Sequence, residues 1–320
     1  MAVLEQVVYT VLTGSTELTS VLGTYHDVPA IFNRQAPDDE ADGWDDPMAP
    51  RMDFWINFFN DPERGVEGNI SLDINIPLET GTLPDVDTDD IEAIVNNLLS
   101  NRFMETTDRG IVALLWHRTD PAQYHKMNPH AAVDRWVKSV TMEFDIVGFP
   151  EQPLGEPNPI TALLEVTRKN ILGAAGAFYV NGISSGLDTW RPLPNKPAIY
   201  WRAISRDVVS ASGNDLTYMI EIKGHIITAA VADRFRYCSI VQDGLKRLSN
   251  IPMSDGSSMQ LVSASGKLPV VFGANSLTMG QITVWGKYKV ASSSVTPKPK
   301  IEEVITSTTT LRVGTSYSQY

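Results

Sequence analysis

Four prolines within eleven residues interrupt this 320-residue chain near its middle. The segment runs Phe149-Pro-Glu-Gln-Pro-Leu-Gly-Glu-Pro-Asn-Pro159. A stretch this rich in proline is extended and semi-rigid, as an interdomain linker is. We therefore predict a first domain at 1–148, a linker at 149–159, a second domain at 160–292 and an extended C-terminal arm at 293–320.

The two halves carry opposite net charge. Residues 1–150 contain 26 Asp and Glu against 9 Lys and Arg, a net charge of −17, whereas residues 151–320 contain 12 against 17, a net charge of +5. An acidic first half repels nucleic-acid phosphates rather than binding them. Opposite charges on the two halves also suit head-to-tail contacts between subunits, because complementary potentials steer association.

The most acidic stretch lies early in the chain, and two readings of it stay open. It is either a solvated surface loop, as charge runs usually are, or an acidic wall or docking patch. A channel through which DNA slides without sticking requires that sign of charge. The candidate lumen-facing or partner-facing residues are Asp38, Asp39, Glu40, Asp42, Asp45 and Asp46.

Composition excludes several classes of protein. A content of 42% hydrophobic and 20% charged residues is typical of a globular chain. One cysteine excludes an internal disulfide framework and a cysteine-based zinc site. No apolar run reaches the roughly 18–20 residues that a bilayer requires, and the first residues lack the pattern of a signal peptide. We expect a soluble intracellular protein without a membrane partner.

A faint internal repeat predicts the fold class. An amphipathic helical stripe at 4–12 is matched by one at 160–171. In the first half, an alternating strand at 70–76 is followed by a second helix near 89–102; in the second half, an alternating strand at 218–226 is followed by a second helix near 231–248. Ser139-Val-Thr-Met142 and Ser276-Leu-Thr-Met279 each open a predicted closing strand, and this is the most specific part of the match. The pattern predicts an α+β protein of two similar domains, each a mostly antiparallel sheet covered by helices on one face.

The last part of the chain is predicted to act on a neighbour. Residues 293–320 are rich in Ser and Thr and cannot build a core, yet Val304-Ile-Thr-Ser-Thr-Thr-Thr-Leu-Arg-Val313 alternates as a strand does. We interpret this segment as an arm that adds to a sheet edge of another subunit. Its candidate contact residues are Val304, Ile305, Leu311 and Val313.

Two catalytic or calcium-binding motifs have better structural explanations. Gly182-Ile-Ser184-Ser-Gly186 matches the nucleophile elbow of serine hydrolases, but three prolines follow where that chemistry needs a helix. Glu221 and His225 follow in hydrolase order, only four residues apart on a predicted strand. The acids from Asp85 to Asp89 resemble the start of a calcium loop, yet its required Gly and Glu are replaced by Asp90 and Asn96.

The remaining metal or nucleophile candidates are also weak. His117, His125 and His130 fall in a region predicted as a polar loop between strands, where a metal site is the less favoured reading. Cys238 lies on the apolar face of a predicted helix and reads as a buried core thiol. We predict no catalytic residue, no metal and no cofactor.

The order of elements in the first half resembles the tail-terminator, or tail-completion, family of tailed bacteriophages. The resemblance rests on a short N-terminal helix, Leu18-Thr-Ser-Val-Leu-Gly23, Pro29-Ala-Ile-Phe32, the paired strands, the helix at 89–102, and Trp136-Val-Lys-Ser-Val-Thr-Met-Glu-Phe-Asp-Ile146. It covers about 150 residues, and the second half echoes it more weakly. The long acidic insert, the second domain and the arm depart from the family's usual single-domain pattern.

The resemblance implies a structural virion protein of the tail and neck, assembled in the host cytoplasm. Such a protein forms a homo-oligomeric ring, sixfold or threefold here, that caps the tail tube and joins the tail to the head. Its partners are the tail tube protein and a neck or head-completion protein, and genomic DNA passes through the bore without specific binding. The alternatives are another neck, collar or baseplate protein, a receptor- or glycan-binding module using Trp44, Trp55, Trp190 and Trp201, and an unrecognised hydrolase using Ser184.

Overall fold

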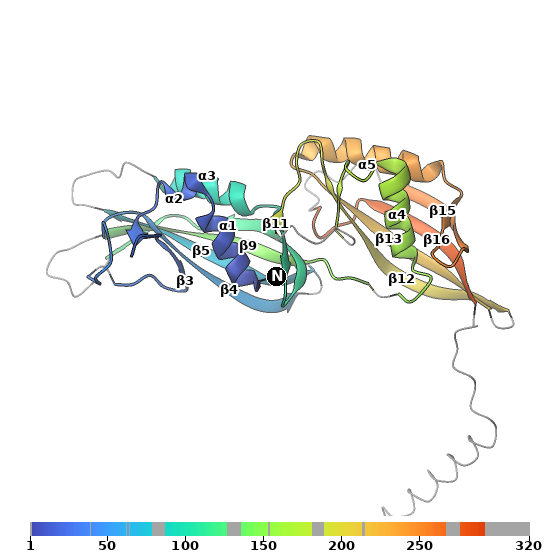
Figure 1. The fold of residues 1–320 in the computed structure, drawn as a ribbon, viewed down its shortest axis with the longest axis horizontal. Helices are drawn as coiled ribbons and strands as arrows, with labels where there is room; N and C mark the ends of the chain where they lie inside the picture. The colour runs from blue at the N-terminus through green and yellow to red at the C-terminus, as the bar shows by residue number, and fades with distance from the viewer. Residues whose placement is uncertain are drawn as a thin grey trace, which may run out of the picture.

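The computed structural model describes two β-rich bodies, each a strongly curled sheet with its helices inside the curl (Figure 1). The described residues are 2–38, 40–61, 63, 65–78, 87–126, 136–152, 154–180, 189–212, 215–266 and 276–291. The predicted arm at 293–320, with Val304, Ile305, Leu311 and Val313, lies outside these ranges.

The first sheet has its longest strands at its centre. Its order is β11-β6-β7-β9-β5-β4-β3, with β8 paired to β9, and β3 runs parallel to β4 while the other pairs are antiparallel. A two-residue pair, β1 (Thr24–Tyr25) and β2 (Val28–Pro29), precedes it. The strands are β3 (Ile31–Asn33), β4 (Arg51–Asp61), β5 (Val66–Leu78), β6 (Phe103–Thr106), β7 (Gly110–Thr119), β8 (Gln123–Lys126), β9 (Trp136–Gly148) and β11 (Thr189–Trp190).

Three helices pack into the curl of this sheet. They are α1 (Leu4–Thr13), α2 (Thr16–Thr19) and α3 (Thr88–Leu99). The N-cap of α3 is Asp87, whose carboxylate accepts the Thr88 N–H and pairs with Lys138 on β9. The buried stripes of α1 and α3 meet alternate residues of β5 and β9, forming one apolar core.

The second sheet has the order β10-β12-β13-β16-β15-β14, and only β10 is parallel to its neighbour. Its core lies between the sheet and three helical segments, of which the second is a π-helical turn continuing the first. Its strands are β10 (Phe178–Tyr179), β12 (Ala198–Ser212), β13 (Asp215–Ile227), β14 (Asn250–Pro252), β15 (Ser258–Gly266) and β16 (Ile282–Ala291), and its helical segments are α4 (Pro159–Val166), η1 (Thr167–Ile171) and α5 (Val231–Lys246).

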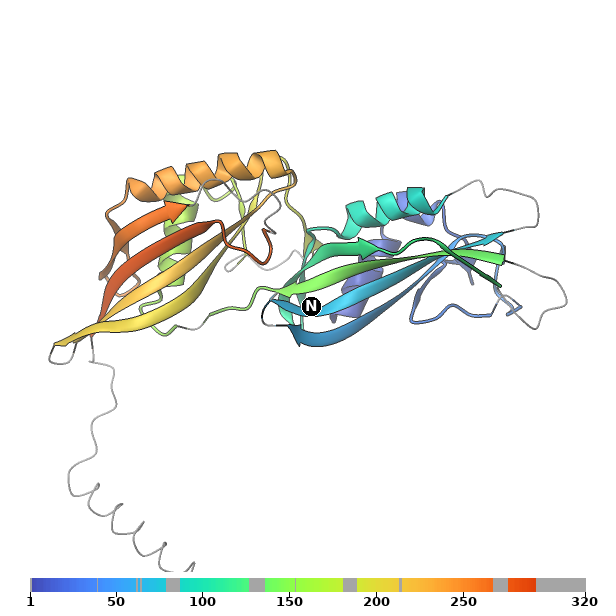
Figure 2. The same ribbon diagram turned by 180° about the vertical axis from the view of Figure 1, so that it is seen from behind.

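A third apolar cluster joins the two bodies. Although β11 follows the linker in sequence, it pairs with β6 of the first sheet, so Trp190 lies opposite Phe103 and stacks on it at 5.4 Å between ring centroids. Phe149 packs edge-on against Tyr200 of β12, at 5.0 Å. Arg102 also donates to Thr189 Oγ1 at 2.7 Å. The reverse view in Figure 2 shows the two sheets meeting end to end at this junction.

The predicted fold class is wrong. Strands make up 47% of the described residues and helices 22%, and the sheets are curled half-barrels rather than sheets with one face covered by a helical layer. The physical reason is strand length: strands of ten to fifteen residues, such as β7 and β12, accumulate enough right-handed twist to curl a sheet around its own core. The helices then fill the hollow instead of forming a separate layer.

The prediction of two similar domains is not supported either. Both sheets do insert their last long strand beside the second, β9 next to β5 and β16 next to β13. The sequence match offered as most specific fails, however: Ser139–Met142 lies inside β9, whereas 276–279 forms a turn before β16 begins at Ile282. Short Ser and Thr patterns suit both turns and strands, so this likeness does not mark equivalent positions.

Candidate functional site: the polar face of the first sheet

The first sheet has one apolar and one polar face, because side chains alternate along each strand. On β5, Ile70, Leu72, Ile74 and Ile76 are buried against the helices. The residues between them project to the other side, where β4 and β9 contribute polar residues at matching positions. We call this side the polar face; its core residues are Asp53, Asn69, Ser71, Asp73, Asn75, Ser139, Thr141, Glu143 and Asp145.

Hydrogen bonds cross the central strands of the polar face. Thr141 Oγ1 donates to Asp73 Oδ1 at 2.6 Å, from β9 to β5. Asn75 Nδ2 donates to Asp53 Oδ2 at 3.1 Å, from β5 to β4, and the Ser139 hydroxyl donates to Asn75. These side chains are half-buried and hold one another in place, so the face is an ordered polar surface.

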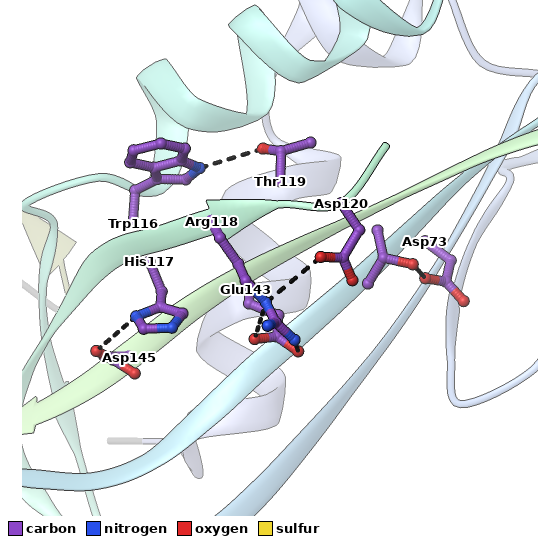
Figure 3. A network of polar contacts seen from close by, with 9 residues as sticks. Asp73, Trp116, His117, Arg118, Thr119, Asp120, Glu143 and Asp145 are labelled. Carbon is purple, nitrogen blue, oxygen red and sulfur yellow. Dashed lines mark hydrogen bonds and ion pairs between the residues drawn. The ribbon is translucent and has the colours of Figure 1, made fainter. Parts of the chain in front are cut away.

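A β-bulge adds a second group of charges. The pairing of β7 with β9 shifts between Trp116 and Arg118, so two successive residues, His117 and Arg118, both reach the polar face. His117 Nδ1 lies 3.4 Å from Asp145 Oδ2, and Arg118 Nε lies 3.0 Å from Glu143 Oε2. Figure 3 shows His117 and Arg118 pointing toward these carboxylates, while Trp116 extends from the opposite side of β7 to Thr119.

Acidic groups outnumber basic ones on this face. Arg118 bridges Glu143 and, at 3.5 Å, Asp120, which leaves one guanidinium facing two carboxylates. Burial raises the pKa of Asp53 to about 6, although the Ala36 N–H and Arg51 act in the opposite direction. Burial also raises the pKa of Asp73, while the hydrogen bond from Thr141 and the charge of His125 lower it.

The predicted acidic stretch forms a loop beside this face. Asp38, Glu40, Asp42, Asp45 and Asp46 are exposed, and Asp39 lies outside the described residues. Trp44 anchors the loop: its ring packs against Tyr25 at 5.1 Å and beneath Arg51 at 5.2 Å, and its Nε1–H donates to the Asp38 carbonyl at 3.0 Å.

The loop and the polar face are connected at one carboxylate. The backbone N–H of Ala36, just before the acidic residues, hydrogen-bonds to Asp53 on β4. The hydrogen bond from Ala36 to Asp53 therefore connects the acidic loop to the polar face. Sequence reasoning found the loop but missed the polar face, although the alternation in 70–76 and 139–146 contained the signal: every second residue there is Asn, Ser, Thr, Asp or Glu.

The catalytic and metal candidates acquire no site in the described parts of the chain. Ser184, Asp85 and His130 lie outside the described residues. No group of three metal-binding side chains occurs among the residues that are described, which include His117 and His125. Cys238 is buried, and burial raises the pKa of its thiol to about 11, which disfavours the nucleophilic thiolate.

The other residues singled out from the sequence are structural in their contacts. His225 is buried on β13, and burial, reinforced by Arg202, lowers its pKa to about 4. Glu221 pairs with Lys223 on the same strand, at 3.3 Å. Of the four tryptophans considered for glycan binding, Trp190 and Trp201 are buried, so the four do not gather on one exposed face.

No family model, curated protein or solved structure matches this chain. Among the described helices, none is long and apolar enough to cross a membrane.

Proposed function

We propose that this chain is a structural protein of the virion that forms a homo-oligomeric ring, caps the tail tube and joins tail to head. The resemblance of its first half to tail-terminator proteins motivates the proposal. Its partners are further copies of itself, the tail tube protein and a neck or head-completion protein. DNA passes through the bore and is not specifically bound.

One observation carries the proposal: the first body has two neighbouring acidic surfaces, and no group of metal-binding side chains occurs among their described residues. The polar face presents Asp73, Asp120 and Glu143, and the anchored loop adds the exposed carboxylates of Asp38, Glu40, Asp42, Asp45 and Asp46. Fixed negative charge on a wall keeps a polyanion from adhering and preserves its mobility. That property is useful in a conduit for DNA and is of no value in a nucleic-acid-binding protein.

The first experiment measures the assembly. Light scattering of the purified native protein, with negative-stain images of the same sample, gives the mass and shape directly. A closed ring of three or six copies has a mass of about 106 or 212 kDa, from a chain of 35.3 kDa. A monomer that also fails to bind isolated tail tubes contradicts the proposal.

The second experiment tests the acidic wall. Glu40→Lys/Asp42→Lys reverses two exposed charges of the loop, and Glu151→Lys/Asp243→Lys reverses two exposed charges elsewhere as a matched control. The loop variant is expected to assemble normally but to retain linear double-stranded DNA in a salt-dependent manner. Equal DNA retention by the loop variant and the control removes the acidic wall from the argument.

A further inference from the structure

The β12–β13 hairpin extends beyond the rest of the second body as a narrow projection (Figures 1 and 2). Every residue of its first strand from Asp207 to Ser212 is exposed. Three apolar side chains of the hairpin are exposed to solvent there: Val208 is 54% exposed, Val209 47% and Leu216 37%. A projecting tip with apolar side chains marks a contact surface rather than a free end.

The apolar surface of this tip continues the core. Val208 lies opposite Tyr218, and Leu216 lies opposite Val290, so these pairs share a face of the sheet. Tyr218 and Val290 are partly buried against the core of the second body. This apolar strip is therefore partly buried at Tyr218 and Val290 and exposed at Val208 and Leu216. Such a strip is expected where another strand is added to a sheet.

One side of the hairpin is paired and the other is open. On the β13 side, β16 pairs up to the register Asp215–Ala291. On the β12 side, β10 pairs only as far as Ile199, and the Gln152 side chain accepts the Ala203 N–H at 2.7 Å. Beyond that point, no described strand pairs with the outer edge of β12.

The open edge is only partly protected. Edge strands are shielded by charged residues, prolines or bulges. Bulges do interrupt β12 near Ile204 and Val209, yet both of these residues are apolar and 47% exposed. Between the bulges, Ser205–Val208 pairs regularly with β13, and although Arg206 and Asp207 are charged, the outer backbone groups of this stretch pair with no described strand and can receive one.

The chain contains a segment that fits this edge. Residues 304–313 alternate as a strand does, and Ile305, Leu311 and Val313 share one face of that alternation. The chain leaves the second sheet at Ala291, beside the same tip. Residues 292–303 then span at most about 40 Å when extended, enough to reach an adjacent subunit.

The direction of exit selects a neighbouring copy as the recipient. Both β12 and β16 are antiparallel to β13, so the chain passes Ala291 travelling outward along the direction of β12. Pairing with its own edge requires a reversal, and Pro297 and Pro299 favour a continued extended course. We propose that residues 304–313 of one copy add as a strand to the open edge of β12 in the next copy.

This inference rests on the proposed ring, because the arm and its edge lie on different copies. The contact is heterologous: each subunit donates an arm and receives one, so the contacts close when the ring closes. The apolar face of Ile305, Leu311 and Val313 is expected to cover Val208 and Leu216, completing the strip.

Disulfide trapping between two variants tests the inference. One preparation carries Ser210→Cys on β12 and the other carries Thr308→Cys on the arm; Cys238 is buried in both. Mixed, exchanged and oxidised, the two variants are expected to give a covalent dimer that neither gives alone. The matched control pairs Thr308→Cys with Ser263→Cys on the opposite edge of the sheet, and equal trapping there overturns the inference.

A doubly substituted chain separates the two possible sources of the arm. Ser210→Cys/Thr308→Cys, oxidised at high dilution, is expected to give chains linked to one another. A quantitative internal disulfide, with no linked chains, shows that the arm pairs with its own edge and overturns the proposal.

Truncation distinguishes failure of this inference from failure of the proposed function. A chain ending at Ala291 and the variant Val208→Asp/Val209→Asp are both expected to lose the ring mass, while the control Val262→Asp, exposed on β15, keeps it. A truncated chain that still forms rings overturns the arm contact and leaves the proposed function intact. A full chain that forms neither rings nor trapped dimers, and that also fails to bind isolated tail tubes, overturns both.

Discussion

Replacing Trp190 with alanine is expected to uncouple the two bodies of the protein. Trp190 is only 5% exposed, stacks on Phe103 with an interplanar angle of 8°, and also contacts Phe178. Truncating a buried tryptophan to alanine costs about 3–5 kcal/mol. The Nε1–H of Trp190 has no hydrogen-bond partner among the described residues. Removing that unsatisfied donor offsets about 1 kcal/mol, which leaves a loss of about 2–4 kcal/mol.

Urea denaturation followed by circular dichroism measures the loss, and hydrogen exchange resolves the two sheets. Wild-type protein is expected to protect both sheets together, whereas Trp190→Ala exposes β6 and β11 first. The control is Trp116→Ala, because Trp116 is 45% exposed and its truncation falls within about 0.5 kcal/mol. A loss below about 1 kcal/mol for Trp190→Ala, with both sheets still exchanging together, refutes the coupling role of this side chain.

Three further predictions concern the sheets and their titrating groups. Gly68→Ala places a methyl group 2.4 Å from a backbone carbonyl oxygen of β4 and should lower the free energy of unfolding by about 1–3 kcal/mol. Gly148→Ala meets only the movable end of a side chain and should lower it less; thermal melts compare the two variants. Asp53 has a raised pKa, so its contribution to stability is full below pH 3.8 and is lost as pH rises through about 6; Asp53→Asn should abolish that component of the dependence of Tm on pH. His225 has a lowered pKa, so its contribution is present above pH 6.5 and is lost as pH falls through about 4; His225→Gln should reduce acid destabilisation in that window, and an unchanged acid limb contradicts the assignment.

Local patterns predicted individual elements well. The alternation at 70–76 predicted what became part of β5, and the stripe at 4–12 predicted α1, because burial of one face dictates those periods. The helix predicted near 89–102 exists at Thr88–Leu99, so it begins one residue earlier and ends three residues earlier. Its start was misplaced because several acids in a row can each cap, and the competition is decided by Lys138 on a distant strand.

Features that depend on distant residues were not predicted. The curl of the sheets is the sum of small twists over long strands, and no single residue encodes it. The pairing of β11 with β6 joins residues far apart in sequence. The polar face needed a bulge at His117 to bring Arg118 beside Glu143, and nothing in the local sequence announces that bulge. The acidic loop was found because its charges are consecutive.

The pairing of β11 with β6 also sets an order on synthesis. While the ribosome has released only the residues up to Gly148, β6 is an unpaired edge strand of the nascent first sheet. The ring of Phe103 then lacks Trp190, the side chain that stacks on it. The first sheet is therefore completed only after Trp190 emerges, when α4 has been made but β12, the first long strand of the second sheet, has not. A fragment ending at the proline-rich segment would leave β6 as an exposed edge strand, which promotes aggregation. Recombinant fragments of this protein should therefore extend beyond Trp190.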